Sequence, residues 1–133
     1  VIDQAGQVIE AVNLPTTDLA IRKRLYFGNP FCHPSVMLRR GVILEAGGYL
    51  GGLHAEDYDL WARLARSENI TFANLPICLL QYRSAGIGVA RRACSAYATM
   101  GAAQFANFAT GTGWRWGVAA IISWGKAMIR GQR

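Results

Sequence analysis

The spacing of apolar residues along this 133-residue chain predicts an α/β first part. Short runs of β-branched, aromatic or leucine residues, each bounded by Pro, Gly, Asn or Asp, are typical of strands. Such runs predict a hairpin at the N-terminus and three further strands, at residues 1–9, 35–38, 70–75 and 77–82. Capping residues and a helical period between these runs predict helices at 17–25, 41–46 and 56–67.

After residue 90 the pattern is helical only. Residues 93–108 form an Ala-rich apolar helix pattern, a break with two glycines follows at 110–113, and residues 114–130 form a second helix pattern. In the second helix a narrow polar stripe faces a broad apolar side, with Ser123, Lys126, Arg130 and Arg133 against Val118, Ile121, Met128 and Ile129. This last helix is therefore predicted to be amphipathic.

The helix predicted at 56–67 carries an acid on its apolar side. Asp57 precedes Leu60 and Trp61 by three and four residues, so it shares their face, whereas Asp59 and Arg63 form an i, i+4 pair on another face. An inward carboxylate is costly unless it is hydrogen-bonded, paired or placed at a cleft. Asp57 is therefore either the N-cap of this helix or a functional residue that faces a cleft.

Composition places the chain among folded proteins. Hydrophobic residues make up 52% of the chain and charged residues 17%, which excludes a disordered chain and allows one domain with its own core. A hairpin that starts at residue 1 predicts that the chain is part of a longer protein.

Charge is distributed unevenly. Residues 1–68 hold seven Lys or Arg and all eight Asp or Glu, a net charge of −1, whereas residues 69–133 hold seven Lys or Arg and no acid. A basic second half indicates an anionic partner, such as a phosphate-bearing substrate, anionic lipid or nucleic acid.

The basic helix at 114–133 has two interpretations. Its apolar run, 116–129, is shorter than the ~20 residues needed to span a bilayer. Trp114, Trp116 and Trp124 beside basic residues favour a helix lying on an anionic membrane surface, and the alternative is a helix packed on protein. Nucleic acid is not predicted as a partner, because the basic residues do not form a compact stripe with stacking aromatics.

The few metal- and redox-active residues do not form a motif. Three cysteines, Cys32, Cys78 and Cys94, are widely spaced, which predicts a reducing, cytoplasmic setting. His33 and His54 would join Asp57 at a metal ion only if the fold collected them. No metal site is predicted in this chain.

Five motifs follow one another in a fixed order. They are Asn29-Pro30-Phe31-Cys32-His33-Pro34-Ser35-Val36-Met37-Leu38-Arg39-Arg40, Gly47-Gly48-Tyr49, Glu56-Asp57-Tyr58-Asp59-Leu60-Trp61-Ala62-Arg63-Leu64, Asn74-Leu75-Pro76 and Gln81-Tyr82-Arg83. This order resembles the family 2 glycosyltransferases, and more narrowly the acceptor-binding second half of their GT-A fold catalytic domain. The resemblance covers about residues 3–83.

The resemblance implies an inverting transfer of a sugar from a nucleotide-sugar donor to a hydroxyl group. The acid at the position of Asp57 would be the general base that takes the proton of the acceptor hydroxyl. A carboxylate in a partly dry cleft suits this task, and such a base contributes about 10²–10⁴-fold. Glu56 would be the neighbouring acid that orients Asp57 or raises its proton affinity.

Further site residues follow from the same resemblance. The donor diphosphate would meet Arg83, which can bind it bidentately. The acceptor would meet six residues, namely Gly47, Gly48, Tyr49, His33, Ser35 and Trp61. The alternatives from the residues alone are an ordinary helix stop for the two glycines, a core position for Tyr49, a turn-stabilising pair for His33 and Ser35, and a solvated or ion-paired Arg83.

The sequence departs from the family pattern in two places. The family uses a D-x-D motif for Mg²⁺ or Mn²⁺ in the nucleotide-binding half, and this chain has no such half. Asp57-Tyr58-Asp59 has the same letters, but residues i and i+2 of a helix lie about 200° apart and cannot chelate one ion. The family often has a His two residues after Tyr82-Arg83, where this chain has Ala85.

The expected organisation is a partial GT-A, Rossmann-like domain at 1–90, followed by a basic helical tail at 91–133. The expected function is glycosyl transfer in cell-surface polysaccharide or glycolipid synthesis, with a sugar or lipid-linked acceptor, at the inner face of the cell membrane. The rival interpretation is a non-catalytic basic module that binds membranes or a partner. A third is a transferase whose donor site is degenerate.

Overall fold

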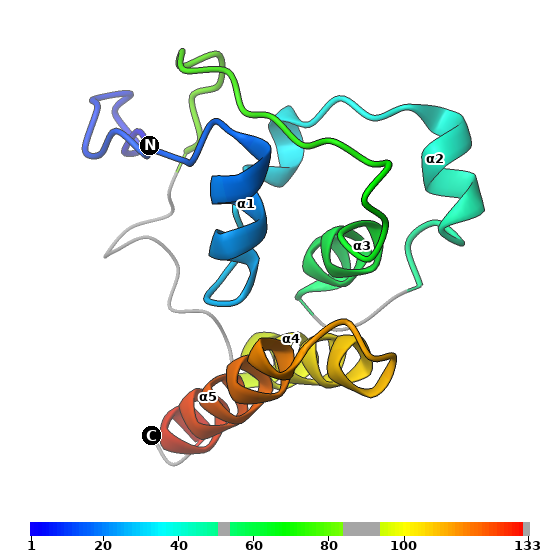
Figure 1. Cartoon of the computed structure of the whole chain (residues 1–133). Coiled ribbons are helices and arrows are strands. Elements are labelled where there is room, and N and C mark those ends of the chain that lie inside the picture. The colour runs from blue at the N-terminus through cyan, green and yellow to red at the C-terminus, as the bar shows by residue number, and fades with distance from the viewer. Residues whose placement is uncertain (51–53, 84–93, 132–133) are drawn as a thin grey trace.

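The computed structural model describes residues 1–50, 54–83 and 94–131 (Figure 1). Its helices are α1 (Asp18–Leu25), the 3₁₀ helix η1 (His33–Ser35), α2 (Arg40–Glu45), α3 (Glu56–Leu64), α4 (Cys94–Ala109) and α5 (Trp114–Gly131). Every helix predicted from the sequence is therefore present, with ends within a few residues of those expected.

The end of α2 shows the left-handed stop that its two glycines predict. Gly47 and Gly48 have φ angles of 83° and 67°. The Gly48 N–H donates to the carbonyl of Ile43 at 2.8 Å, which closes the last turn. Tyr49 comes directly after this turn, so the helix stop also sets where Tyr49 leaves the helix.

The strands predicted at 35–38, 70–75 and 77–82 are wrong for this structure, whereas the hairpin predicted at 1–9 is present in reduced form, as a turn at residues 4–6 closed by an antiparallel bridge. The described residues contain no strand, only bridges in which Ile2 pairs with Val8 and with Arg83. A strand exists only through hydrogen bonds to a neighbouring strand, and apolar residues of these segments, such as Ile77 and Leu79, are exposed. At 35–38 a further reason applies, because Ser35 belongs to the 3₁₀ turn His33–Ser35, in which Pro34 is the second residue.

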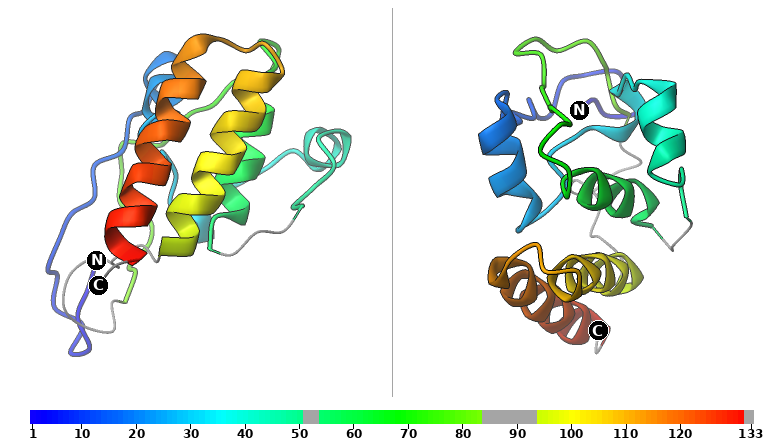
Figure 2. Two further views of the ribbon diagram at one scale, coloured as in Figure 1. Left: turned by 90° about the horizontal axis from the view of Figure 1, so that it is seen from below. Right: turned by 45° about the vertical axis from the view of Figure 1, so that its right-hand side comes forward.

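Two layers share one core (Figure 2). The upper layer holds α1 and α3 beneath the irregular segments, and the lower layer is the antiparallel hairpin of α4 and α5. The largest buried side chains come from both layers, and among them are Leu25, Tyr58, Trp61, Met100 and Trp116. The tail predicted at 91–133 thus packs on the first part of the chain.

Buried polar side chains tie α3 to α4. Asn107 donates from Nδ2 to the carbonyl of Ala62 at 2.8 Å and accepts from Arg66 Nε at 2.6 Å. Gln104 donates from Nε2 to the Tyr58 hydroxyl at 2.8 Å, and that hydroxyl donates to the carbonyl of Leu25. Since buried polar groups are stable only when paired, these bonds fix how the two layers meet.

The last helix is amphipathic but turned differently from the prediction. Its small residues face inward, and Ser123, which the sequence placed on the polar stripe, is buried with Ala119, Ala120 and Ala127. The predicted apolar side is exposed instead: Val118, Ile121, Met128 and Ile129 all face solvent. The reason is close packing, because small side chains let α5 approach α4 where branched ones would not. Among the described residues no helix is long and apolar enough to cross a membrane.

Candidate active site

Asp57 lies in the first turn of α3. The helix begins at Glu56, and the N-cap position is Ala55, so the interpretation of Asp57 as N-cap is wrong. Its Oδ1 accepts the backbone N–H of Tyr58 at 2.7 Å, and its side chain is 14% exposed. The carboxylate is therefore held in place while one side stays open to solvent.

Asn29 is the partner of Asp57 that sequence reasoning missed. Its Nδ2 donates to Asp57 Oδ2 at 2.5 Å, and its Oδ1 accepts the N–H of Phe31 at 3.1 Å. Because the second bond fixes the oxygen, the amide nitrogen must point at Asp57. The signal was the Asn29-Pro30 pair, since Asn before Pro favours a turn in which the side chain bonds the backbone.

His33 and Tyr49 complete a polar group beside Asp57. The His33 Nδ1 lies 4.0 Å from Asp57 Oδ2, and its Nε2 lies 3.0 Å from the Tyr49 hydroxyl. The two rings are tilted at 34° with centroids 5.5 Å apart. The predicted residues Asp57, His33 and Tyr49 are thus brought together from three separate segments.

Arg63 holds the turn that carries Tyr49. Its Nε donates to Asp59 at 2.8 Å, which is the ion pair predicted from the i, i+4 spacing. The same guanidinium donates to the carbonyls of Ala46 and Gly48, the latter at 2.6 Å. Since α3 also carries Asp57, one helix positions both the carboxylate and the tyrosine turn.

The pKa of Tyr49 reflects the burial and the negative charges around this polar group. Burial raises the pKa of the Tyr49 phenol above its ordinary value of 10.0, and the negative charges of Asp57 and Glu56 raise it further. A neighbouring carboxylate disfavours the phenolate, so the hydroxyl keeps its proton at neutral pH. Tyr49 can therefore donate or accept a hydrogen bond at the site.

A small pocket opens between α3 and α4 at Asp57. Its polar wall consists of Asn29, His54 and Asp57, and its apolar wall includes Ala96 and Met100 of α4. His54 has a φ of 63°, a backbone conformation that is uncommon for a residue with a side chain. The pocket therefore joins the acid to the helical hairpin, which the sequence did not predict.

The other predicted site residues have structural contacts. Ser35 donates from Oγ to the carbonyl of Cys32 at 2.8 Å, as a turn-stabilising residue does. Trp61 is 1% exposed and packs behind the site against Phe31 and edge-on to His33, so it supports the site and does not line it. Arg83 donates to the carbonyls of Asp3 and Gln4 at 2.8 and 2.9 Å, near the chain start.

Metal ligands do not gather in the described part of the chain. No group of three or more His, Cys, Asp or Glu side chains is placed there to hold an ion. The two acids of the apparent D-x-D motif accept hydrogen bonds from different residues, Asp57 from Asn29 and Asp59 from Arg63. Residues 1–50, 54–83 and 94–131 therefore offer no cluster of acids that would hold Mg²⁺ or Mn²⁺.

Comparison with known proteins identifies relatives of one kind. The chain is 43% identical over 83 residues to the O-antigen biosynthesis glycosyltransferase WbnJ of Escherichia coli, a match that covers 62% of this chain and 32% of the relative. It is 35% identical over 79 residues to the amylovoran biosynthesis glycosyltransferase AmsE of Erwinia amylovora, covering 59% and 29% of the two chains. Over about three fifths of its length the chain is therefore similar to part of two glycosyltransferases.

The similarity to these glycosyltransferases covers about a third of their length. No family model matches the chain. No solved structure matches it either. The similarity therefore supports a relationship to glycosyltransferases, and the activity, substrates and partners of the whole protein are proposals.

Proposed function

We propose that this chain is the acceptor-binding part of an inverting, family 2-like glycosyltransferase in which Asp57 is the general base. The observation that carries the proposal is the partly buried Asp57 carboxylate, held by Asn29 at the edge of a pocket and flanked by His33 and Tyr49. This is the arrangement that a base for a sugar hydroxyl requires: a fixed acceptor of protons with access to one substrate atom.

In the proposed step the acceptor hydroxyl binds at the open side of Asp57. Each carboxylate oxygen has a lone pair beyond those used by Asn29 and Tyr58, so it can accept the hydroxyl proton. As the proton moves to Asp57, the hydroxyl oxygen bonds to the anomeric carbon of the donor. The bond from that carbon to the nucleoside diphosphate breaks on the opposite face, and the configuration inverts.

His33 and Tyr49 would bind the acceptor sugar in this scheme. Both are partly exposed beside the carboxylate, and together they offer an aromatic face and hydrogen-bonding groups. Gly47 and Gly48 would allow close approach to the backbone at the turn, and Glu56 would add negative charge beside Asp57.

The donor side of the reaction is part of the proposal as well. The nucleotide-sugar, and the Mg²⁺ or Mn²⁺ that the resemblance implies, would be bound mainly by protein outside these residues, with Arg83 near the diphosphate. The names of the two relatives support a role in O-antigen or exopolysaccharide biosynthesis. We further propose that the protein works at the cytoplasmic side of the membrane.

The test is Asp57→Asn in the complete protein that contains this chain. Release of nucleoside diphosphate from a panel of nucleotide-sugars, with polysaccharide precursors as acceptors, measures the transfer. We expect the rate to fall by about 10²–10⁴-fold, because the amide cannot take the proton. Glu45→Gln, an equivalent change of an exposed acid on α2, is the matched control and should leave the rate unchanged.

A folded Asp57→Asn protein with near-normal turnover would remove Asp57 from the role of base. If the unmodified complete protein releases no nucleotide with any donor, the rival interpretation, a non-catalytic binding module, replaces the enzyme.

A further inference from the structure

The pocket beside Asp57 has a polar rim and an apolar floor. Asn29, His54 and Asp57 supply polar groups, whereas Ala96 and Met100 of α4 close the pocket on the opposite side. Ala96 and Met100 are 3% and 1% exposed, so a group must enter the pocket to reach them. They are four residues apart and share one face of the helix, which makes the floor a continuous apolar surface.

The size of the pocket limits what it can hold. Its volume is about 170 Å³, below the roughly 300–1,000 Å³ of pockets that enclose a drug-sized ligand. Since a water molecule takes up about 30 Å³ of liquid, the space is only several times the size of a water molecule. The pocket therefore accepts one small substituent of a sugar and not a whole oligosaccharide.

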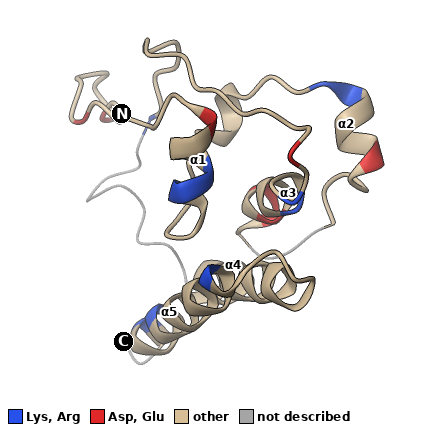
Figure 3. Cartoon of the chain, in the orientation of Figure 1, with Lys and Arg blue, Asp and Glu red and all other residues tan. Residues whose placement is uncertain are grey.

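Charge excludes an acidic occupant. The described residues that line the pocket include the Asp57 carboxylate and no Lys or Arg. Helix α4 has no charged residue along its length, and Figure 3 shows α3, which carries acids, above this uncharged helix. A carboxylate or phosphate in the pocket would face Asp57 without a Lys or Arg to pair with, which is costly. The occupant is therefore uncharged.

The floor is held in a fixed position relative to the acid. One turn after Met100, Gln104 donates from Nε2 to the Tyr58 hydroxyl at 2.8 Å. Tyr58 follows Asp57 directly in the sequence and also lines the pocket. A wall that is held in this way discriminates between substituents, because it does not move aside to admit a larger one.

We propose that this pocket binds a small, uncharged substituent of the acceptor sugar that ends in a methyl group, and that Ala96 and Met100 determine which substituent fits. The inference rests on the proposed function, in which Asp57 takes the proton of a hydroxyl next to that substituent. Asn29 and His54 would bond its polar part at the rim. The methyl group would lie on the floor, where a hydroxyl would lose its bonds to water.

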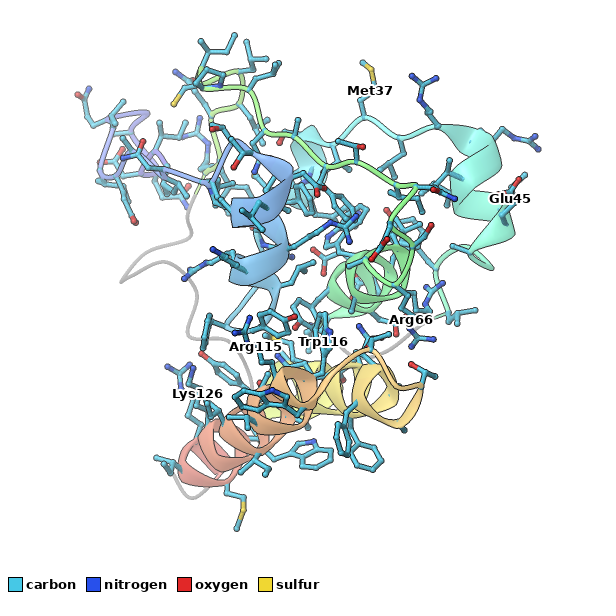
Figure 4. All side chains as sticks on the ribbon, in the orientation of Figure 1. Met37, Glu45, Arg66, Arg115, Trp116 and Lys126 are labelled. Carbon is cyan, nitrogen blue, oxygen red and sulfur yellow. The ribbon has the colours of Figure 1, made fainter. Side chains whose placement is uncertain are left out.

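Methionine methyl NMR tests this binding without any transfer reaction. In the complete protein with ¹³C-labelled methionine methyl groups, Met100→Leu assigns the Met100 signal. The probes are a 2-acetamido-2-deoxyhexose, a 6-deoxyhexose and their parent hexose. We expect the Met100 signal to shift with one of the two methyl-bearing sugars and not with the parent, which also identifies the substituent. Met37 is 97% exposed at the upper edge of the molecule in Figure 4, so its signal is the internal control and should stay unchanged.

Variants of the floor test its role in specificity. We expect the complete protein to have a kcat/KM about tenfold or more higher for the methyl-bearing acceptor than for the parent hexose. Ala96→Leu should bring this ratio close to one, because the larger side chain fills the pocket, whereas Ala102→Leu at an exposed position of α4 should leave it unchanged. Met100→Ala deepens the pocket and should favour an acceptor whose substituent is one carbon longer. Melting temperatures show whether each variant is folded.

Two results would overturn this inference: a Met100 signal that none of the sugars shifts, or an acceptor preference that Ala96→Leu and Met100→Ala both leave unchanged. The proposed function fails by a different result, namely near-normal turnover in Asp57→Asn. Loss of turnover in Asp57→Asn together with an unchanged acceptor preference in the floor variants would therefore remove the subsite and keep the base.

Discussion

At the scale of single residues, hydrogen bonds restrict the side chains of the site to particular orientations. The Asn29 amide is fixed by Phe31, so its nitrogen must face Asp57. His33 bonds Tyr49 on one side of the ring and approaches Asp57 on the other. Such preorganised contacts are what a proton-transfer site needs, because little has to move when substrate binds.

The pKa of Tyr49 tests this geometry without any substrate. It is raised by burial, by Asp57 and by Glu56, in that order. We expect Asp57→Asn to lower the Tyr49 pKa, because removal of a negative charge makes the phenolate less unfavourable, and Glu56→Gln to lower it less. Tyrosinate absorbance during an alkaline titration, with Tyr49→Phe to assign the transition, gives the value. An unchanged pKa in Asp57→Asn would mean that the two side chains are not neighbours in solution.

At the scale of elements, arginines join helices to loops. Arg22 of α1 pairs with Asp18 at 2.7 Å and donates to the carbonyls of Ala65 and Ile70 beyond α3. Asp18 in turn accepts the N–H of Phe72 at 2.9 Å. An i, i+4 ion pair that looks local in the sequence therefore holds a long irregular segment against two helices.

The pH dependence of the unfolding free energy of Asp18→Asn should test this role of Asp18. Burial by itself would raise the pKa of Asp18, but the bonds from Phe72 and Arg22 hold it below 3.8. The stabilisation is present at neutral pH and is lost as pH falls through the folded-state pKa. We expect the variant to lose about 1 kcal/mol of unfolding free energy at pH 7, a modest value since Asp18 is one-third exposed.

The difference between Asp18→Asn and the unmodified protein should shrink below about pH 4 in urea denaturation. Glu45→Gln on the exposed side of α2 serves as the control. A difference that persists at low pH would show that the carboxylate charge is not the source of the stabilisation.

At the scale of the whole molecule, the hairpin is bound to the first part of the chain by buried polar groups. Asn107 is fully buried and joins α4 to both Ala62 and Arg66. These bonds, together with the shared apolar core, predict that the two layers unfold as one cooperative unit.

Asn107→Ala should lower the unfolding free energy of that cooperative unit. It leaves a buried carbonyl and an arginine without their partner, so we expect a loss of about 2 kcal/mol in unfolding free energy. Circular dichroism and the fluorescence of Trp61 and Trp116 should still give one coincident transition. Ala106→Ser, the exposed neighbour, should be close to neutral. Two separate transitions in the unmodified protein would contradict the shared core.

The helices were predictable because their signals are local. The apolar period, the turn residues before α1 and the Gly47-Gly48 stop each act within a few residues. The pair of Asp59 and Arg63 was predictable for the same reason, since a helix fixes the distance between residues four apart. The strands were not, because a strand depends on a neighbour that local sequence cannot supply.

The sequence by itself determined the helices, the inward position of Asp57 and the basic character of the second half. Only the tertiary structure decided that Asn29 is the partner of Asp57, that His33 and Tyr49 meet beside it, and that α5 turns its small residues inward. Helical periodicity is a property of neighbouring residues, whereas these contacts join segments about 16 to 28 residues apart or select which face packs. Close packing of Ala and Gly decided the orientation of the last helix. These residues are only weakly hydrophobic, so the apolar pattern of the sequence does not predict that their face is buried.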